Sequence, residues 1–415
     1  MQGFTVSWLC QWFEAVPEGT AYLRYSERCE YRLKCSKLFE KIDDLGEKYL
    51  DILEAVCNIE SPTDFKKGVD EVGRYFLNFA KEKGWKTEVL PHSISGDVVC
   101  ITMNPDATQK PVSLSAHIDT VHPVGFFGTP AVRRDEKNIY GPGVSDCKGG
   151  AVVALLAMDA LEKCGFTSRP VMLLLQSDEE KGSAPSGKET INYICEKAKD
   201  SIAFLNLEPA GTKNIAVLRR KGILRFLITV RGKACHSSKC YEGVNAIAEA
   251  AYKILQLEKM KDPDGITCNC GVINGGSAPN TVAEECSFYA DIRFATIEQE
   301  KEARERVREI SEHTELGGCT CTVKEISYRP MMKEAEKNYN LLEKINSIYS
   351  DNGFDKLKTK FAYGGSDAAY VTERGIPCVD TLGPVGGNIH SINEYTEIAS
   401  ITETAKRIAA VIYCI

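Results

Sequence analysis

Residues 149–176 read GGAVVALLAMDALEKCGFTSRPVMLLLQ, and this stretch decides the fold prediction. Its first part, 149–162, carries small and apolar side chains and is predicted to be a helix. Its last part, 171–176, is a short, continuous apolar run, which is typical of a strand buried on both faces of a sheet. The stretch therefore predicts a helix followed by a buried strand.

Similar apolar runs lie on both sides of this stretch. They cover residues 97–103, 112–116 and 203–207, and a polar helix at 188–199 precedes the last of them. Upstream, residues 38–83 carry apolar side chains at helical spacing. Strands that alternate with helices indicate a mostly parallel sheet with helices on both faces.

The pattern changes after Gly211. The segments expected beyond this point follow the order strand-helix-strand-strand-helix-strand, which is a ferredoxin-like alternation. They are 224–231 (strand), 244–257 (helix), 266–272 and 281–294 (strands), 298–313 (helix) and 319–327 (strand). From Asn338 a helix, a glycine-rich loop and a last helix over 401–412 return to the first pattern. An inserted domain is the economical explanation.

We therefore predict two domains, as the length of 415 residues also suggests. The larger domain comprises residues 38–215 and 330–415, and a smaller domain, residues 216–329, is inserted into it. Residues 1–37 form an N-terminal extension of uncertain order, for which a docking arm, a frayed tail and an upstream extension all stay open. The predicted fold class is α/β, with a mostly parallel sheet and an inserted ferredoxin-like α+β domain.

The composition argues against several classes of protein. With 43% hydrophobic and 26% charged residues, the chain resembles a soluble globular protein. A net charge of -7 without a basic cluster argues against nucleic acid as a partner. We expect no membrane span, because no apolar run reaches about 18 residues, and no secretory signal, because the N-terminus lacks a basic region. The 17 cysteines are interpreted as reduced thiols of a cytoplasmic protein.

The first candidate for a functional site is His117-Ile-Asp119, which directly follows the apolar run 112–116. Residues two apart on an extended backbone share a face. His117 can therefore bind a metal while Asp119 holds its other ring nitrogen, the usual arrangement around a metal-bound histidine. Alone the motif is weak, because such a pair is more often a capped turn.

Four further segments carry acids or a histidine at similar places. Asp146 lies in a glycine-rich loop ahead of the helix quoted above, and Glu179 and Glu180 follow the strand quoted above. Glu208 follows the next apolar run, and His390 lies in a loop close to the last helix. Each has an ordinary alternative: a helix cap, a solvated turn, a surface acid or a loop histidine without a special role.

Taken together, these five segments indicate a metal site more strongly than any one of them does alone. Adjacent acids repel one another unless cations or protons share the site, and two of only six histidines occur at these positions. Nitrogen and carboxylate ligands suit zinc, and cobalt or manganese can be held as well. Two metal ions bridged by one carboxylate would activate a water molecule and polarise a carbonyl group.

In their order along the chain, these segments resemble the co-catalytic zinc metallopeptidase family that contains glutamate carboxypeptidase, aminoacylase, succinyl-diaminopimelate desuccinylase and tripeptidase. The resemblance runs from about residue 38 to the C-terminus and is closest in pattern to glutamate carboxypeptidase. It implies two zinc ions in the larger domain. The implied metal ligands are His117 and Glu208 for one ion, Glu180 and His390 for the other, and Asp146 as the bridge.

The resemblance also implies roles for the residues around the metal ions. Glu179 would be the general base, taking a proton from the attacking water and later giving it to the leaving amine. Asp119 would orient His117. A cis peptide bond between Asp146 and Cys147 is implied as well.

In relatives the inserted domain makes a homodimer and covers the active site. His236, in Cys235-His236-Ser237, matches a histidine that reaches the active site of the other subunit. There it would stabilise the oxyanion of the reaction. The alternative is a surface histidine that precedes a helix.

Five more residues match positions of the family that contact the substrate. They are Asn280, Arg293 and Arg329, beside the substrate carboxylate, and Gly365 and Ser366, on the leaving-group side. Arginine suits such a position because its planar group can bind a carboxylate through two hydrogen bonds. For Arg293 an ion pair with Asp291 or Glu285 is the alternative.

The sequence therefore predicts a di-zinc hydrolase that cleaves an amide or peptide bond next to a free carboxylate in a small peptide or N-acyl amino acid. A carboxypeptidase that releases a C-terminal glutamate fits the pattern best. A deacylase of acetyl- or succinyl-amino acids is the alternative, with the same chemistry. A non-catalytic, metal-binding dimeric interaction protein is a second alternative. Glu179 argues against it, because a scaffold needs no free base beside its metal ligands.

Overall fold

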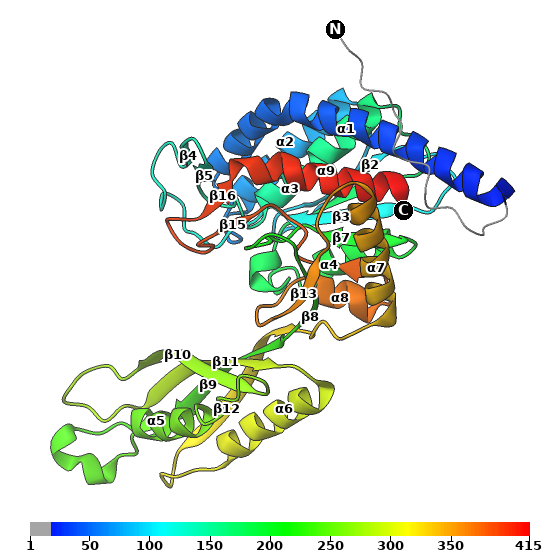
Figure 1. Cartoon of the computed structure of the whole chain (residues 1–415). Helices are drawn as coiled ribbons and strands as arrows, with labels where there is room; N and C mark the ends of the chain where they lie inside the picture. Colours follow the sequence, from blue (N-terminus) through cyan, green and yellow to red (C-terminus); the bar gives the residue numbers. More distant parts are fainter. Residues whose placement is uncertain (1–17) are drawn as a thin grey trace.

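The computed structural model describes residues 18–415, with side chains from Cys35 onward, so that residues 1–17 of the predicted extension 1–37 lie outside the described residues. Figure 1 shows two units, a larger one with helices around a central sheet and a smaller one joined to it by a narrow connection. Helix α1 (Glu18–Asn58) crosses the top of the larger unit in this view, and α9 (Ile398–Cys414) runs below it.

A six-stranded sheet forms the centre of the larger unit, in the order β1-β2-β6-β3-β7-β14. Strands β6, β3, β7 and β14 run parallel to one another, whereas β2 runs antiparallel to β6, and β1 antiparallel to β2. The prediction of a mostly parallel sheet is confirmed. The strands are β1 (Lys86–Leu90), β2 (Val98–Met103), β3 (Val112–His117), β6 (Val171–Gln176), β7 (Ala203–Asn206) and β14 (Cys378–Val379).

Helices cover both faces of this sheet. Alternate residues of a strand point to opposite faces, and in β6 Leu173 joins the core under α1, α2, α3 and α9, while Leu174 joins the core under α4 and α8. Burial on both faces explains why β6 is a continuous apolar run. The remaining helices of the larger unit are α2 (Lys66–Glu82), α3 (Lys148–Lys163), α4 (Glu189–Ala198), α7 (Glu336–Asp351) and α8 (Ala368–Glu373).

Two glycines allow helix α3 to begin against the end of β7. A Cβ atom on Gly149 would lie 2.1 Å from the carbonyl oxygen of Val144, and one on Gly150 would lie 2.2 Å from that of Leu207. Neither distance leaves room for a side chain, so only glycine permits this close approach. The loop that precedes α3 is thereby held beside the carboxyl end of β7.

The smaller unit is a four-stranded antiparallel sheet in the order β10-β11-β9-β12, and helices α5 and α6 pack against it around a core of its own. Thr296 caps α6, because its hydroxyl accepts the backbone N–H of Gln299. The ferredoxin-like alternation predicted from the sequence is confirmed. The elements are β9 (Gly222–Arg231), α5 (Ala246–Leu257), β10 (Thr267–Gly275), β11 (Glu285–Phe294), α6 (Ile297–Glu312) and β12 (Thr320–Arg329).

The chain passes between the units at two places. It leaves the larger unit at Lys221, between β8 and β9, and returns after β12 at Pro330. Lys221 is buried, and its Nζ donates to the carbonyl oxygens of Pro263 and Gly265 at 2.8 and 2.7 Å. We propose that these two points delimit the inserted domain, close to the boundaries 216–329 expected from the sequence.

Short strands complete the larger unit. Strands β8 and β13 pair in parallel, and β15, β16, β5 and β4 form a small sheet in that order. Their bounds are β4 (Arg133–Arg134), β5 (Asn138–Tyr140), β8 (Ile215–Arg220), β13 (Lys358–Ala362), β15 (Gly386–Gly387) and β16 (Tyr395–Glu397). Two 3-10 helices, η1 (Glu179–Lys181) and η2 (Ser237–Glu242), lie in the larger and the smaller unit respectively. Over the described part of the chain, no helix has both the length and the apolar character needed to cross a membrane.

Candidate metal centre and active site

The candidate residues meet at one edge of the central sheet. His117 is the last residue of β3, Glu179 and Glu180 begin η1 shortly after β6, and Glu208 lies two residues after β7. Strands β6, β3 and β7 are parallel neighbours, so their carboxyl ends lie side by side, where an open α/β sheet binds its ligand. Asp146 reaches the same edge from the loop that the two glycines of α3 hold beside β7.

Two groups of possible metal ligands share one carboxylate. The first group is His117, Asp146, Cys147 and Glu208, and the second is Asp146, Glu180 and His390. In the first, Nε2 of His117 lies 3.0 Å from Oδ1 of Asp146 and 4.0 Å from Oε2 of Glu208. In the second, Nε2 of His390 lies 3.3 Å from Oδ2 of Asp146 and 3.3 Å from Oε2 of Glu180.

The donor set fits divalent metal ions. Imidazole nitrogens and carboxylate oxygens are ordinary zinc ligands, and Asp146 turns one oxygen toward each group. Burial raises the pKa of Glu180 to about 7 and the pKa of Glu208 well above its usual value. Hydrogen bonds with Asp146 and Glu180 raise the pKa of His390 to about 10. Without cations these groups would hold protons instead, because like charges this close repel one another.

Asp119 connects His117 to the loop that carries the two glutamates. Its Oδ1 lies 3.4 Å from Nδ1 of His117, and its backbone carbonyl oxygen is closer to that nitrogen, at 3.0 Å. Its carboxylate also accepts the backbone N–H groups of Glu179 and Glu180 at 3.2 Å and the hydroxyl of Thr63 at 2.7 Å. Asp119 is fully buried, so it fixes both the ring and η1 in place.

Glu394 is a residue of the site to which the sequence analysis gave no role. Its Oε1 accepts the backbone N–H groups of Ser145 and Asp146, both at 3.0 Å, and it is almost completely buried. The peptide bond between Asp146 and Cys147 is cis, as the resemblance implied. A single glutamate in a loop has no distinguishing pattern, and its contact with Asp146 joins residues 248 positions apart. No local signal could have found it.

Glu179 is not part of either ligand group; it pairs with an arginine from the smaller unit. Nη1 of Arg329 donates to its Oε1 at 2.5 Å, and Nη2 donates to its carbonyl oxygen at 2.5 Å. Arg329 is buried and lies 4.0 Å from Oδ1 of Asp367, whose pKa burial raises to about 7. Arg329, the last residue of β12, thus holds the carboxylate of Glu179 beside the ligand groups.

A pocket of about 300 Å³ opens over the ligand groups at the junction of the two units. Acids and His390 line one part of it, and four arginines line another. Of the substrate-binding residues predicted from the sequence, Arg293, Arg329 and Gly365 line the pocket. The full lining is Asp146, Glu179, Glu180, Gly182, Glu208, Pro209, Arg220, Ile223, Arg225, Arg293, Ser327, Arg329, Gly364, Gly365, Ile389 and His390.

The other two predicted substrate-binding residues, Ser366 and Asn280, do not line this pocket, and neither does the predicted catalytic residue His236. Ser366 is buried behind it, where its hydroxyl oxygen accepts the side-chain amide of Asn206 at 3.0 Å. His236 and Asn280 lie in the smaller unit, and the carbonyl oxygen of Asn280 accepts the N–H of Ser237 at 2.9 Å. The predicted role of His236 concerns the active site of a second subunit, so it stays a prediction.

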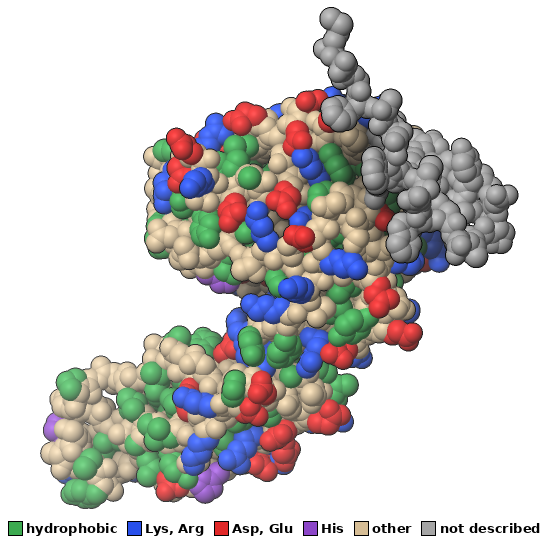
Figure 2. Space-filling view, in the orientation of Figure 1, with side chains coloured by type: hydrophobic (Ala, Val, Ile, Leu, Met, Phe, Trp, Pro, Cys, Tyr) green, Lys and Arg blue, Asp and Glu red, His purple; other side chains and the backbone are tan. Residues whose placement is uncertain are grey.

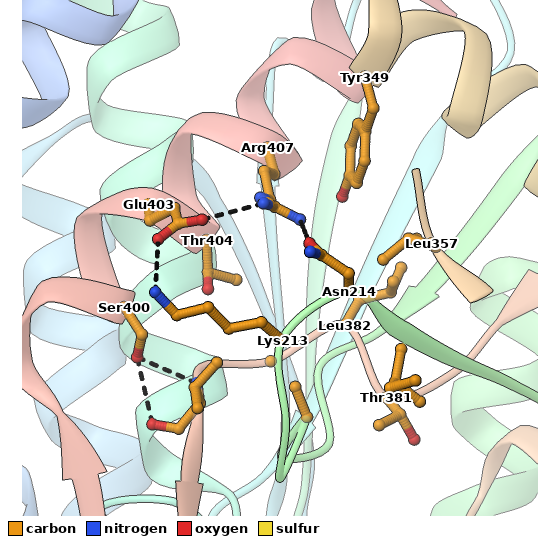
Figure 3. Close-up of a pocket in the computed structure, with 14 residues that line it drawn as sticks. Lys213, Asn214, Tyr349, Leu357, Thr381, Leu382, Ser400, Glu403, Thr404 and Arg407 are labelled. Carbon is orange, nitrogen blue, oxygen red and sulfur yellow. Dashed lines mark hydrogen bonds and ion pairs between the residues drawn. The ribbon is translucent and has the colours of Figure 1, made fainter. Parts of the chain in front are cut away.

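A second cavity, shown in Figure 3, lies between α9 and the segment before β8. It measures about 40 Å³, which is room for little more than a water molecule. Its charged groups pair with one another: Arg407 contacts Glu403 at 2.9 Å and Asn214 at 2.7 Å, and Lys213 lies 3.6 Å from Glu403. We assign the chemistry to the pocket of about 300 Å³, because carboxylates of both ligand groups line it.

Several known proteins are similar to this chain over most of its length. The model of peptidase family M20/M25/M40 matches residues 113–413. Carboxypeptidase G2 of Pseudomonas sp. (strain RS-16) is 28% identical over 372 residues, which cover 88% of each chain. Succinyl-diaminopimelate desuccinylase of Nitrosospira multiformis is 24% identical over 368 residues, covering 83% of this chain and 92% of the relative.

A solved structure shows the same fold. A tripeptidase from Staphylococcus aureus superposes with a TM-score of 0.75 at 22% identity, covering 89% of this chain and 98% of that chain. The chain therefore belongs to peptidase family M20/M25/M40 and is a metal-dependent hydrolase. The family, fold and enzyme class expected from the sequence are confirmed.

Proposed function

We propose that the protein is a carboxypeptidase-like hydrolase that cleaves an amide or peptide bond next to a free carboxylate, using two metal ions. The observation that carries the proposal is that Asp146 belongs to both ligand groups, with one oxygen toward each. One ion would be held by His117 and Glu208, and the other by Glu180 and His390. Zinc suits these donors best, and cobalt and manganese suit them as well.

Such ions, when bound, polarise the scissile carbonyl group and lower the pKa of the attacking water. Glu179 is then the general base: it takes a proton from the water and returns it to the leaving nitrogen. Its position supports this role, because it lines the pocket beside the ligand groups without belonging to either. Asp119 keeps the ring of His117 in place through its contact with Nδ1. It keeps the start of η1 in place by accepting the backbone N–H groups of Glu179 and Glu180.

The substrate carboxylate would bind at the arginine-lined part of the pocket. Arg293 lines it and is partly exposed, and Arg329 lies closer to the ligand groups, paired with Glu179. Arginine binds carboxylates through two parallel hydrogen bonds, which fixes the orientation of the substrate. The likeness to carboxypeptidase G2 supports a carboxypeptidase, and release of a C-terminal glutamate is the specific form that we propose.

A deacylase is the second candidate, and the likeness to succinyl-diaminopimelate desuccinylase favours it. Both reactions use the same residues and differ only in the group on the acyl side of the bond. The chain's substrates are in either case small peptides or N-acyl amino acids. A reducing, cytoplasmic location also belongs to the proposal, because the many cysteines follow no disulfide pattern.

We also propose that the protein forms a homodimer through the smaller unit. Hydrophobic side chains gather on the visible face of this unit (Figure 2). Strand β10 lies at the edge of its sheet, and Val272 and Ile273 on it are 51% and 49% exposed. An unpaired edge with exposed apolar residues favours pairing with another chain. In a dimer, His236 and Asn280 would serve the site of the other subunit.

The test is hydrolysis by purified protein supplied with zinc. The substrates are N-benzoyl-glutamate, alanyl-glutamate, N-acetyl-glutamate and N-succinyl-glutamate, each beside a form whose α-carboxylate is capped as an amide. We expect cleavage of the free acids and little cleavage of the capped forms, because a capped α-carboxyl group cannot form an ion pair with Arg293. Inactivity of the metal-loaded protein on every amide would refute the proposal, and the acyl group that reacts fastest separates the two candidate functions.

A further inference from the structure

The four arginines of the active-site pocket differ in how fully they are engaged. Arg220 donates from Nε to Asp380, from Nη1 to the carbonyl oxygen of Gly364 and from Nη2 to the hydroxyl of Thr381. Arg329 donates twice to Glu179, as described above. The side chains of Arg220 and Arg329 are only 11% and 6% exposed. Arg220 therefore has little donor capacity left for a ligand. Arg329 keeps an unpartnered Nε but is buried and already paired with Glu179.

Arg225 and Arg293, in contrast, share a single carboxylate. Nε of Arg225 lies 2.6 Å from Oδ2 of Asp291, and Nε of Arg293 lies 2.6 Å from Oδ1 of the same residue. Nη2 of Arg293 also donates to Oδ2 at 3.2 Å. Two positive charges are thus balanced by one negative charge. A guanidinium group has five N–H donors, so most of the donors of Arg225 are uncommitted among the described residues.

The strands place this pair where a substrate would pass. Arg225 of β9 lies opposite Asp291 of β11 and opposite Ser327 of β12 in the sheet register, and side chains at opposed positions share a face. Arg293 is two residues beyond Asp291 and therefore lies on the same face. Arg225, Arg293 and Ser327 all line the pocket. The side chain of Arg225 is 40% exposed and thus open to a ligand.

We infer that Arg225 is a specificity-determining residue that binds a second carboxylate of the substrate, so that the preferred leaving amino acid has an acidic side chain. This inference rests on the proposed function, in which Arg293 binds the α-carboxylate. Asp291 would act as a positioning residue that holds the two guanidinium groups side by side. An amino acid with two carboxylates would then meet two arginines. A neutral side chain would leave Arg225 without its ionic partner.

The experiment compares two substrates of nearly the same shape, N-benzoyl-glutamate and N-benzoyl-glutamine, with the zinc-loaded full-length protein. The variants are Arg225→Gln, which removes the charge, and Arg225→Lys, which keeps it. Arg231→Gln is the matched control, because Arg231 lies on the same strand but is exposed, pairs with Glu285 and does not line the pocket. Steady-state kinetics give kcat and KM for each pair.

We expect the wild type to prefer the glutamate substrate and Arg225→Gln to lower its kcat/KM by about 10- to 100-fold, mainly through KM, as loss of a charged hydrogen bond does. The value for the glutamine substrate should stay within about twofold, and Arg225→Lys should recover part of the preference. Arg231→Gln should behave as the wild type.

Two results would overturn the inference and leave the proposed function intact: equal wild-type rates on both substrates, or equal losses on both in Arg225→Gln. A zinc-loaded wild type that cleaves no amide at all would instead refute the proposed function and, with it, this inference. The two failures are therefore distinguishable by the activity of the wild type alone.

Discussion

Arg329, the last residue of β12 in the smaller unit, donates to both the carboxylate and the carbonyl oxygen of Glu179 in the larger unit. Both side chains are largely buried. A residue of the inserted ferredoxin-like unit therefore fixes the position of the proposed general base. The two units meet at the candidate active site through this pair, so substitutions in one unit should affect the chemistry of the other.

Replacement of Arg329 by Gln should cost both stability and activity. Loss of one partner of a buried ion pair leaves an uncompensated charge, which typically costs about 3–5 kcal/mol. We expect the free energy of unfolding, measured with urea, to fall by an amount of this order, and kcat to fall with it. Arg219→Gln is the control, because Arg219 pairs with Glu334 at the surface, where ion pairs contribute about 0–1 kcal/mol. Similar unfolding of Arg329→Gln and the wild type would show that the pair does not form in solution.

Glu179→Gln and His117→Ala should separate catalysis from metal binding. Glu179 lies outside both ligand groups, so its replacement should leave the metal content unchanged while turnover falls by about 10²–10⁴-fold. The variant should also be less stable than the wild type, because Arg329 loses its buried ionic partner. His117 belongs to the first group, so its replacement should lower the metal content. Metal analysis of the purified variants beside their kinetics is the measurement. Equal loss of metal in both would mean that their roles are wrongly assigned.

The smaller unit contains a buried carboxylate whose contribution should depend on pH. Glu249 on α5 accepts the N–H of Leu316 at 2.8 Å and the N–H of Glu315 at 3.3 Å, and it lies 3.0 Å from Nζ of Lys253. Burial raises the pKa of Glu249, but these contacts outweigh it and lower the pKa overall. A lowered pKa stabilises the fold above the pKa of the unfolded chain, and this stabilisation is lost as the pH falls through the folded value.

We therefore expect Glu249→Gln to lower the free energy of unfolding by about 1–3 kcal/mol at pH 7, the usual cost of losing hydrogen bonds to a buried charge. The difference from the wild type should shrink as the pH falls below about 4.3, the ordinary pKa of glutamate in an unfolded chain, because the unfolded wild type then binds a proton more readily than the folded wild type does. Urea unfolding between pH 3 and 7 gives the comparison. Glu302→Gln, on the exposed side of α6, is the control and should show little change at any pH. A constant difference across this range would contradict the assignment.

The sequence predicts the buried elements of the fold closely. Strand β6 coincides with the apolar run 171–176, and α3 extends the predicted helix by one residue at each end. Both elements carry strong apolar patterns, because the packed core surrounds them. Strands β8 and β13 were not predicted: their pairing joins segments more than a hundred residues apart, and β13 is largely exposed. Pairing between distant segments leaves no local periodicity to detect.

Some residues of the candidate site could likewise be predicted from the sequence, and others could not. His117, Asp146, Glu180, Glu208 and His390 were selected from the sequence because they follow apolar runs or lie in glycine-rich loops, and the structure brings them together. Glu394, Arg220 and Arg225 were not selected, because their importance comes from contacts with distant parts of the chain. An arginine inside a strand looks like any other surface cation until the opposite strand is known.

The proposed dimer leads to a test of His236 that uses mixed subunits. The ring of His236 is exposed in the single chain, with Nδ1 2.8 Å from Oγ of Ser238, and it is absent from the lining of the pocket. If it serves the partner's site, His236→Ala and Glu179→Gln should each be nearly inactive as homodimers. A mixed dimer would contain one intact site, made from Glu179 of one subunit and His236 of the other.

Refolding the two variants together in equal amounts should therefore recover roughly a quarter of the wild-type activity per subunit, since about half of the dimers would be mixed and each would hold one working site of two. Glu179→Gln refolded with His117→Ala is the matched control. That mixture should recover less, because both residues belong to the site within one chain and every mixed dimer has a defect in each site. Affinity tags of two kinds on the subunits would measure how many mixed dimers form. Mixed dimers without recovered activity would show that His236 does not act across the interface, because the missing histidine would then have been supplied and had no effect.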